Sequence, residues 1–251
     1  MSIRVSLLLA VTAGAGLPAA AQERPAHRVD AHASYSDLSG GLDAWQEATA
    51  TYSAELSRDS IAAMHVETHR RFGVDERFAE LRLSRRLQAG TLHVAVGSAG
   101  KGIFKPRFSL LADYETDLGG GGGAWKLLAG GGASWFDGNE ALALKLGVEK
   151  RLTTNGWSGR AQLVAIADRG GNSPIGYSLR VSGPVSPSTT LSVSYSEVAE
   201  PEQLEVVKVE GWSASLVFEI DDHWQWRLDG ASEERGSYFR DELGIGVARR
   251  F

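Results

Sequence analysis

Hydrophobic and polar residues alternate along most of the chain after residue 30, and a period of two predicts β-strands. In the stretch SIAAMHVETHRR, one face carries Ala62, Met64, Val66 and Thr68, and the other carries His65, Glu67, His69 and Arg71. The stretch RFAELRLSRRLQ repeats the pattern, with Ala79, Leu81, Leu83 and Leu87 opposite Glu80, Arg82, Ser84 and Arg86. Each predicted strand therefore has one hydrophobic face and one charged or polar face.

The alternation divides the chain into up to fourteen predicted strands. The stretch 125–136 is interrupted by glycines, so it reads as one strand, a hairpin or an inward loop, and twelve strands is the alternative. An even number lets the first and last strands pair antiparallel and close a barrel. The predicted strands are 30–38, 45–57, 60–72, 76–87, 90–98, 106–116, 125–136, 140–152, 156–167, 174–183, 189–197, 206–220, 223–233 and 238–251.

Two all-β architectures share this alternation. A soluble sandwich buries its hydrophobic face against a second sheet, whereas a membrane barrel turns that face to lipid. Many of the strands approach the roughly 9–11 residues that a tilted transmembrane strand needs. Trp45, Trp157 and Trp224 fall at strand ends, where we expect an aromatic girdle at the lipid interface. These features favour a closed antiparallel transmembrane β-barrel of 12–14 strands.

The N-terminal residues have the pattern of an export signal. MSIRVSLLLAVTAGAGLPAAAQ combines Arg4 with a short apolar run and ends in alanines that a signal peptidase could cleave. A membrane anchor is the alternative, but the run is shorter than the roughly 20 apolar residues a spanning helix needs. We expect a signal peptide at 1–21, a short periplasmic lead at 22–29 and the barrel at 30–251.

Composition narrows the location and the partners. The chain contains no cysteine and has a formal net charge of −5, which argues against a disulfide framework and against general nucleic-acid binding. Without a second long apolar segment, a closed barrel is the remaining route across a bilayer. We therefore expect the outer membrane, with membrane lipids and lipopolysaccharide as partners. The oligomeric state does not follow from the sequence.

The end of the chain and the connections support the same architecture. Leu243, Ile245, Val247 and Phe251 place hydrophobic residues along the final strand, which we expect barrel-assembly machinery to recognise. If the N-terminus faces the periplasm, the periplasmic gaps are mostly short and the outer gaps mostly longer, as outer-membrane barrels require. The gap before Trp125 and the short link at Gly236 are exceptions.

The candidate chemistry is sparse. HVETH, residues 65–69, differs from the zinc-protease motif, and on a strand its two histidines are roughly 13 Å apart. We predict no metal site, no cofactor and no catalytic residues. Glu200, Glu202 and Glu205 are expected in a solvated outer loop. We expect a lumen-lining polar cluster, either as structural filling or as a path for a polar solute, formed by His65, Glu67, His69, Arg71, Glu80, Arg82 and Arg86.

An enzyme is the alternative to a non-enzymatic barrel. Ser84 is predicted to face inward, but no histidine and carboxylate stand at a spacing that would complete a nucleophilic site with it. A barrel enzyme that modifies lipid or glycan would need such groups to meet from other strands.

Short stretches along the mature chain resemble one family. These are WQEATATYS, HRRFGVDERFAEL, LSRRLQAGTLHVAVG, KPRFSLLADYET and the closing LGIGVARRF. Together they resemble the YaiO-type outer-membrane β-barrel proteins, and the glycine-rich segment 119–134 departs from the regular hairpin expected there. The resemblance implies an integral barrel in a Gram-negative envelope with no catalytic residues to carry over. It further implies a surface, passage or envelope-assembly role linked to polysaccharide export.

Overall fold

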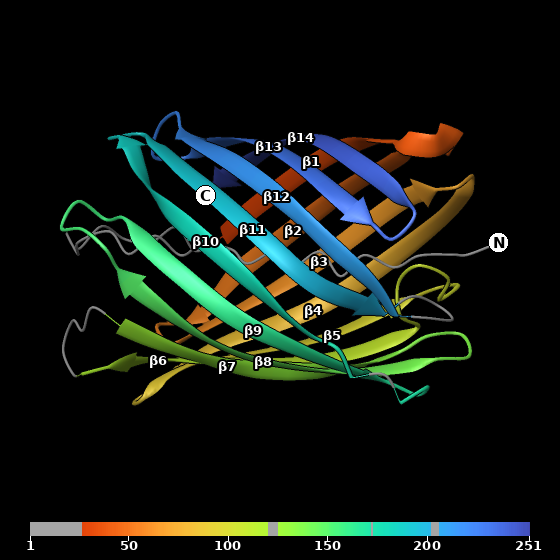
Figure 1. The fold of residues 1–251 in the computed structure, drawn as a ribbon. Coiled ribbons are helices and arrows are strands. Elements are labelled where there is room, and N and C mark those ends of the chain that lie inside the picture. The colour runs from red at the N-terminus through yellow and green to blue at the C-terminus, as the bar shows by residue number, and fades with distance from the viewer. Residues whose placement is uncertain (1–26, 120–124, 172, 202–205) are drawn as a thin grey trace.

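The computed structural model describes residues 27–119, 125–171, 173–201 and 206–251. Within these residues, fourteen strands form one closed antiparallel barrel, in which β1 pairs with both β2 and β14 (Figure 1). The predicted closed barrel is confirmed, and fourteen is the strand count. In the same ranges, no helix is long and apolar enough to cross a membrane. The predicted export signal lies outside the described residues.

The strands lie close to their predicted positions. β1 begins at His27, a few residues before the predicted start, and one short 3-10 helix, η1, follows it at Ser39–Gly41. The bounds are β1 His27–Leu38, β2 Trp45–Ser57, β3 Ser60–Arg71, β4 Val74–Leu87, β5 Gly90–Ala99, β6 Phe108–Leu118, β7 Trp125–Trp135, β8 Glu140–Arg151, β9 Ser158–Asp168, β10 Ile175–Ser186, β11 Thr189–Pro201, β12 Val206–Glu219, β13 Trp224–Arg235 and β14 Tyr238–Arg250.

The barrel has two ends, which we name by what lies there. The terminal end is where β1 begins and β14 ends, since Arg28 pairs with Arg250. The loop end carries η1 and the connections β3–β4, β5–β6 and β7–β8. Figure 1 shows the tilted strands running between these two ends, with η1 at the right.

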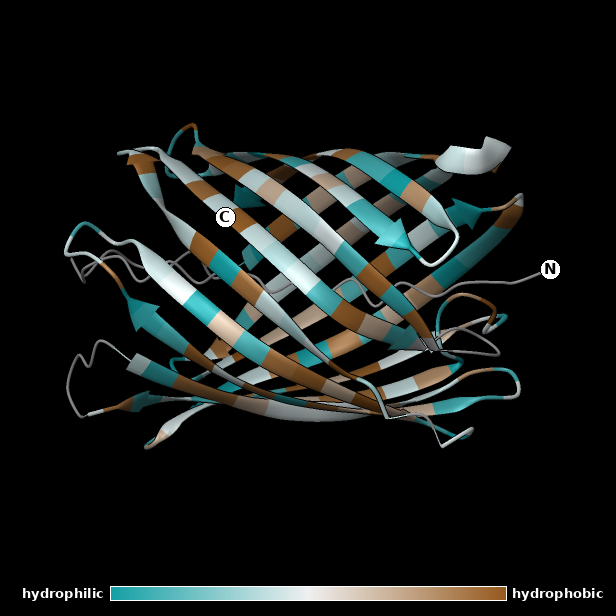
Figure 2. Ribbon diagram, in the orientation of Figure 1, coloured by the Kyte–Doolittle hydropathy of each residue, from teal (hydrophilic) through white to brown (hydrophobic). Residues whose placement is uncertain are grey.

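The two faces of the wall differ as the alternation predicts. On β8, Leu142, Leu144 and Leu146 point outward and are 60, 69 and 56% exposed, while Lys145 between them is buried. Figure 2 shows the resulting hydrophobic and hydrophilic bands alternating along the strands. Because no second sheet covers the outward leucines within the described residues, the sandwich alternative is wrong.

The glycine-interrupted stretch 125–136 forms a single strand, β7, and one of its glycines has a structural reason. Gly130 lies between Asp113 of β6 and Lys145 of β8 in the strand register. Lys145 Nζ is 2.7 Å from Asp113 Oδ1, so this ion pair crosses the inner surface of β7. A Cβ on Gly130 would overlap the Asp113 carboxylate. Glycine is therefore required there for the two neighbouring strands to be joined by charge.

The barrel closes between its first and last strands. Eleven residue pairs connect β1 to β14, from Arg28 with Arg250 to Leu38 with Arg240, and Phe251 N–H donates to the carbonyl oxygen of His27 at 2.9 Å. Leu243, Ile245 and Phe251 are 75, 48 and 55% exposed on the outside, and Val247 is half-buried. The predicted C-terminal residues thus lie along this seam.

Candidate functional site

The connection between β5 and β6, residues 100–107, folds into the loop end of the lumen. Its sequence contains Ile103 and Phe104, two apolar residues that a solvated loop would leave in water. Phe104 is fully buried, and Lys105 is 8% exposed. Burial of a whole phenylalanine side chain stabilises a structure by about 1.5–3 kcal/mol. We call residues 100–107 the inward segment.

Glu76 on β4 holds the inward segment in place. Its Oε1 accepts a hydrogen bond from Ile103 N–H at 2.8 Å, and its Oε2 accepts from Phe104 N–H at 2.8 Å and Lys105 N–H at 3.0 Å. Three successive backbone N–H groups thus surround one carboxylate, a recurrent way to bind an anion. The carboxylate is 2% exposed, so losing it would leave buried donors unpaired.

A second set of charges fixes the side chain of Lys105. Lys105 Nζ is 2.8 Å from Glu67 Oε2, and Glu67 Oε1 is 2.9 Å from His69 Nδ1. His69 Nε2 lies 3.3 Å from Glu76 Oε2, and its ring contacts Phe104 edge-on. These contacts form a closed series. It runs from Lys105 of the inward segment to Glu67 and His69 on β3, then to Glu76 on β4, which binds the inward segment again.

Side chains fill the lumen across its width at this level. Phe104 packs in one cluster with Phe136, Ala141, Val164 and Ile166 from the β7–β9 side of the wall. Val74 of β4 and Val198 of β11 pack against the same cluster, and these two strands are seven places apart in the ring of fourteen. The packed layer therefore joins opposite walls, so the loop end of the lumen is occupied by protein.

Phe72 completes this layer from an unfavourable backbone conformation. Phe72 and Gly73 form the tight β3–β4 turn, with φ of +51° and +74°. Such turns favour Asn-Gly, because a bulky residue is strained at positive φ. The Phe72 ring contacts Trp45, Phe104 and Tyr238. The strained backbone thus coincides with a ring that links β2, the inward segment and β14.

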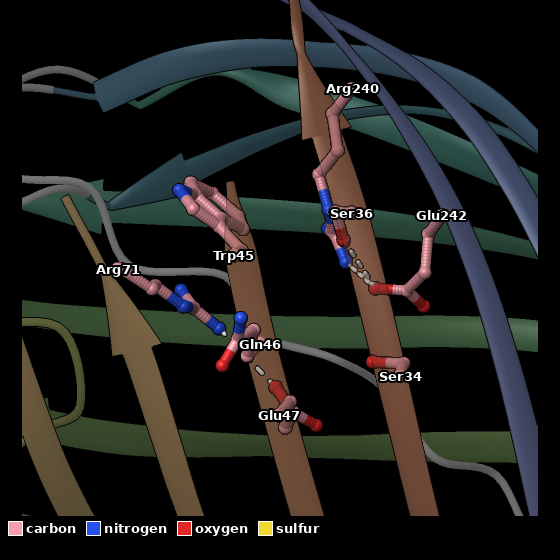
Figure 3. Close-up of a pocket in the computed structure, with 8 residues that line it drawn as sticks. All are labelled: Ser34, Ser36, Trp45, Gln46, Glu47, Arg71, Arg240 and Glu242. Atoms are coloured by element: carbon pink, nitrogen blue, oxygen red, sulfur yellow. Dashed lines mark hydrogen bonds and ion pairs between the residues drawn. The ribbon is translucent and has the colours of Figure 1, made fainter. Parts of the chain in front are cut away.

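Three arginines surround one tryptophan beside the aromatic layer. The guanidinium carbons of Arg71, Arg235 and Arg240 lie 4.5, 5.5 and 4.9 Å from the centre of the Trp45 ring. All four residues are no more than 3% exposed. Figure 3 shows the small pocket between Trp45, Arg71 and Arg240, which is also lined by Ser34, Ser36, Gln46, Glu47 and Glu242.

Four glutamates offset these buried cations. Arg235 donates to Glu200 at 2.9 Å and to Glu233 at 2.8 Å, and Arg240 donates to Glu233 at 3.1 Å. Arg240 is also paired with Glu242, and Arg71 with Glu47 at 3.5 Å. Buried charges need such partners, because an unpaired buried ion is costly. The prediction that Glu200 lies in a solvated loop is wrong, while Glu202 and Glu205 lie outside the described residues.

The predicted lumen residues divide by depth. Glu67, His69, Arg71 and Glu80 are buried, and His65 and Arg82 are half-buried. Arg82 pairs with Glu80 two residues earlier on the same strand, and His65 Nδ1 is 2.9 Å from Thr51 Oγ1 on β2. Arg86 is exposed near the terminal end. The structure therefore joins Glu67, His69 and Arg71 to the inward segment and leaves Arg82 and Arg86 apart from it.

The lumen wall offers little catalytic or metal-binding chemistry. Among the described residues, no group of three His, Cys, Asp or Glu side chains is placed to hold a metal ion. Ser84, His93 and Asp113 face one another across β4, β5 and β6, and Ser84 Oγ is 2.8 Å from His93 Nδ1. In the part of the chain described, no hydrogen bond joins His93 to Asp113, whose carboxylate pairs with Lys145. The three residues therefore lack the contact that orients a catalytic histidine.

Aromatic residues on the outside differ from the predicted girdle in one respect. Trp45 belongs to the lumen, so its assignment to the girdle is wrong; it shares the inward face of β2 with Glu47. Trp224 is 39% exposed at the terminal end, beside Arg249, and Trp157 packs over Gly183. Further exposed aromatic side chains, outside the predicted girdle, are Tyr35, Tyr52, Phe108, Trp125, Trp135, Tyr177, Trp212, Trp226 and Phe239.

Sequence reasoning missed Phe72, Glu76, Phe104, Arg235 and Arg240. One pattern could have indicated the inward segment, namely two consecutive apolar residues, Ile103 and Phe104, within a predicted outer loop. The partners of Arg235 and Arg240 depend on which strands meet at the seam and therefore could not be read locally.

Comparisons with known proteins agree with this fold. The model of the YaiO membrane beta barrel domain matches residues 26–203. Comparison with curated proteins gives no match. Omp33, an outer membrane protein of Acinetobacter baumannii, is 10% identical with a TM-score of 0.57, covering 91% of this chain and 99% of Omp33.

Two further solved structures share the barrel. A bacterial polysaccharide outer membrane secretin is 11% identical with a TM-score of 0.54, covering 92% of this chain and 100% of its own. An outer membrane channel from Pseudomonas putida F1 is also 11% identical with a TM-score of 0.54, covering 92% and 97%. At these identities the likeness concerns the fold alone.

Proposed function

Because the chain belongs to the YaiO membrane β-barrel family, we propose that it is a non-enzymatic passage protein of the outer membrane whose lumen is closed at rest by the inward segment. The protein is an outer-membrane barrel, and its exposed outward leucines contact membrane lipid. The single observation that carries the proposal is the packed layer around Phe104, which fills the loop end of the lumen.

The construction of the closure supports a removable barrier. The inward segment is a connection between two strands, so it could leave the lumen without breaking the β5–β6 ladder. Its anchors are Glu76 and Glu67, both on neighbouring strands of the same wall. Connections of this kind open locally at a lower free-energy cost than the strands around them.

The orientation and partners form part of the proposal. With the terminal end in the periplasm, the inward segment closes the lumen toward the cell surface, where lipopolysaccharide contacts the outer girdle. The exposed residues Leu243, Ile245 and Phe251 on the final strand are then the signature for the barrel-assembly machinery. We propose a polar glycan as the cargo, in line with the fold shared with the polysaccharide secretin.

Conductance in planar bilayers tests the passage function. We expect little conductance from the wild-type protein and a stable increase when Phe104 and Lys105 are both replaced by alanine, because the cross-lumen layer and the Glu67 ion pair are lost. The matched control is Phe239→Ala, since Phe239 is a 55% exposed aromatic on the outside at the same end. A folded F104A/K105A variant that conducts no better than the control would refute the proposal.

A further inference from the structure

Three arginines face the lumen outside the layer that the inward segment forms: Arg160 and Arg227 near the terminal ends of β9 and β13, and Arg180 near the middle of β10. Arg180 on β10 lies directly opposite Arg160 on β9, and Arg227 on β13 is near enough to add positive charge to the surroundings of Arg180. Like charges placed directly opposite on neighbouring strands destabilise a sheet. An arrangement of this kind calls for a compensating negative charge.

The carboxylates nearby are already bonded to other residues. Glu149 Oε2 accepts from Arg160 Nε at 2.8 Å and from Arg160 Nη2 at 2.6 Å. Asp229 accepts from Arg227 Nε at 2.7 Å, and its other oxygen is 3.1 Å from His32 Nε2. Neither acid is therefore available to serve as a close partner for Arg180.

Arg180 has a different environment from the other two arginines. In the ranges that the structure describes, it forms no hydrogen bond or ion pair, and Glu149, which lies beyond Arg160 in the strand register, is bonded to Arg160. Its neighbour on β11 is Ser194, whose hydroxyl is 2.7 Å from that of Ser213 on β12. Ser178, on the same face of β10, is half-buried beside it. Free guanidinium donors thus stand beside serine hydroxyls on the lumen wall.

We propose that Arg180, with Ser178 and Ser194, forms a binding site for the anionic group of a polar solute. The ligand chemistry is a planar or tetrahedral group with at least two acceptor oxygens, a carboxylate or a phosphate. A guanidinium binds such groups through two parallel N–H donors, and hydroxyls donate to the remaining oxygens. The anion also offsets the repulsion between Arg180 and Arg160.

This inference rests on the proposed passage function for its biological meaning, since it makes the cargo an acidic glycan or another phosphate- or carboxylate-bearing solute. Binding itself does not require passage. Arg180 is half-buried near the middle of β10 and is not among the residues that pack against Phe104, so the site does not depend on the position of the inward segment.

Isothermal titration calorimetry on the full barrel in lipid nanodiscs, at low ionic strength, tests the site. The probes are inorganic phosphate, a hyaluronan tetrasaccharide for the carboxylate, and uncharged chitotetraose. We expect Arg180→Gln to weaken binding of a charged probe about tenfold, the loss typical of one charge-assisted contact. Arg180→Lys keeps the positive charge but lacks the two parallel N–H donors of a guanidinium, so we expect a smaller loss of affinity. Arg82→Gln is the control, because Arg82 lies on β4, away from Arg180, and is already paired with Glu80 of the same strand.

The outcomes separate this site from the passage function. A response to hyaluronan alone assigns a carboxylate, and a response to phosphate alone assigns a phosphate. Equal affinities of wild type and Arg180→Gln, equal binding of chitotetraose, or no binding of either charged probe would each overturn the site. If the site binds anions but the F104A/K105A variant shows no increase in conductance in planar bilayers, the passage function is refuted and the anion site stands.

Discussion

The carboxylate of Glu76 on β4 and the backbone N–H of Phe104 are joined by a hydrogen bond of 2.8 Å, which ties the inward segment to the barrel wall. The bond links a strand residue to a connection 28 positions later in the chain. The flanking bonds to Ile103 and Lys105 make this carboxylate the main polar anchor of the closure.

Glu76→Ala should therefore release the inward segment. We expect a loss of about 3 kcal/mol in the free energy of unfolding, since removing a charged acceptor leaves buried donors unpaired. Urea unfolding in lipid vesicles measures this loss, and planar bilayers measure the accompanying rise in conductance. The control is Glu115→Gln near the terminal end, where Glu115 is 3.9 Å from Lys126 and half-exposed. Equal stability of the two variants would contradict the anchoring role.

Phe72→Asn separates backbone preference from side-chain packing. Asparagine suits the positive φ of this turn, which saves about 1 kcal/mol of strain, but it removes the ring contacts with Trp45, Phe104 and Tyr238. We expect a net loss of stability smaller than that of Phe104→Ala, together with increased conductance. Unfolding by urea and single-channel recording measure the two effects. A variant that is more stable and equally closed would show that the ring contributes nothing to the closure.

Gly130→Val should break the ion pair that crosses β7. The added side chain would displace Asp113 from Lys145, and overpacking of this kind typically costs about 1–3 kcal/mol. The free energy of unfolding in vesicles measures the cost. Ala129→Val, one residue earlier on the exposed outer face, is the control and should be close to neutral. The pair Asp113→Asn with Gly130→Val should be less than additive, because the first change already removes the ion pair.

Leu144→Arg tests the contact of the outer wall with lipid. An arginine facing the middle of the bilayer destabilises a barrel by about 2–4 kcal/mol. Leu144 is 69% exposed on β8, whereas Thr51 on β2 is half-buried on the inward face opposite Asp30. Thr51→Arg should therefore fold with little loss in the same vesicle assay. Similar costs for both substitutions would contradict the assignment of the two faces.

Asp221 provides a pH-dependent test in the β12–β13 turn, outside the membrane-spanning strands. Its Oδ1 accepts from His223 N–H at 2.8 Å and from Trp224 N–H at 2.7 Å, and these bonds lower the pKa of the Asp221 carboxyl. A lowered folded-state pKa stabilises the turn above the unfolded value, near 4, and the contribution disappears as pH falls through the folded value.

Asp221→Asn removes this charge and keeps an acceptor. We expect the urea midpoint of the wild-type protein to exceed that of the variant at neutral pH, and the difference to vanish in acid. Asp222→Asn is the control, because the neighbouring Asp222 is exposed in the same turn. A difference between wild type and Asp221→Asn that does not change with pH would contradict the assignment.

The sequence predicted the strands well because alternation is a local property. Leu144 and Lys145 reveal their opposite faces through their immediate neighbours alone, whatever strands lie beside them. The same parity could have placed Trp45 in the lumen, since it is two residues from Glu47 and so shares its face. Its position at a strand end was the weaker indication.

The closure could not be predicted, because it depends on contacts between distant strands. Nothing near Phe104 in the sequence indicates that Glu76 presents an acceptor to it, and nothing near Glu200 indicates Arg235, 35 residues later. Such partners follow from the strand register and the diameter of a fourteen-stranded ring. The isolated charge of Arg180 likewise becomes visible only once Arg160 and Ser194 are known to flank it.

The seam between β1 and β14 has a consequence for biogenesis. Residues more than 200 positions apart must pair before the barrel closes. Until then, the sheet has two edge strands with unpaired backbone groups, and its hydrophobic outer face is exposed. Such intermediates are prone to edge-to-edge association in water. We therefore expect the polypeptide to need protection from such association until the β1–β14 seam has closed.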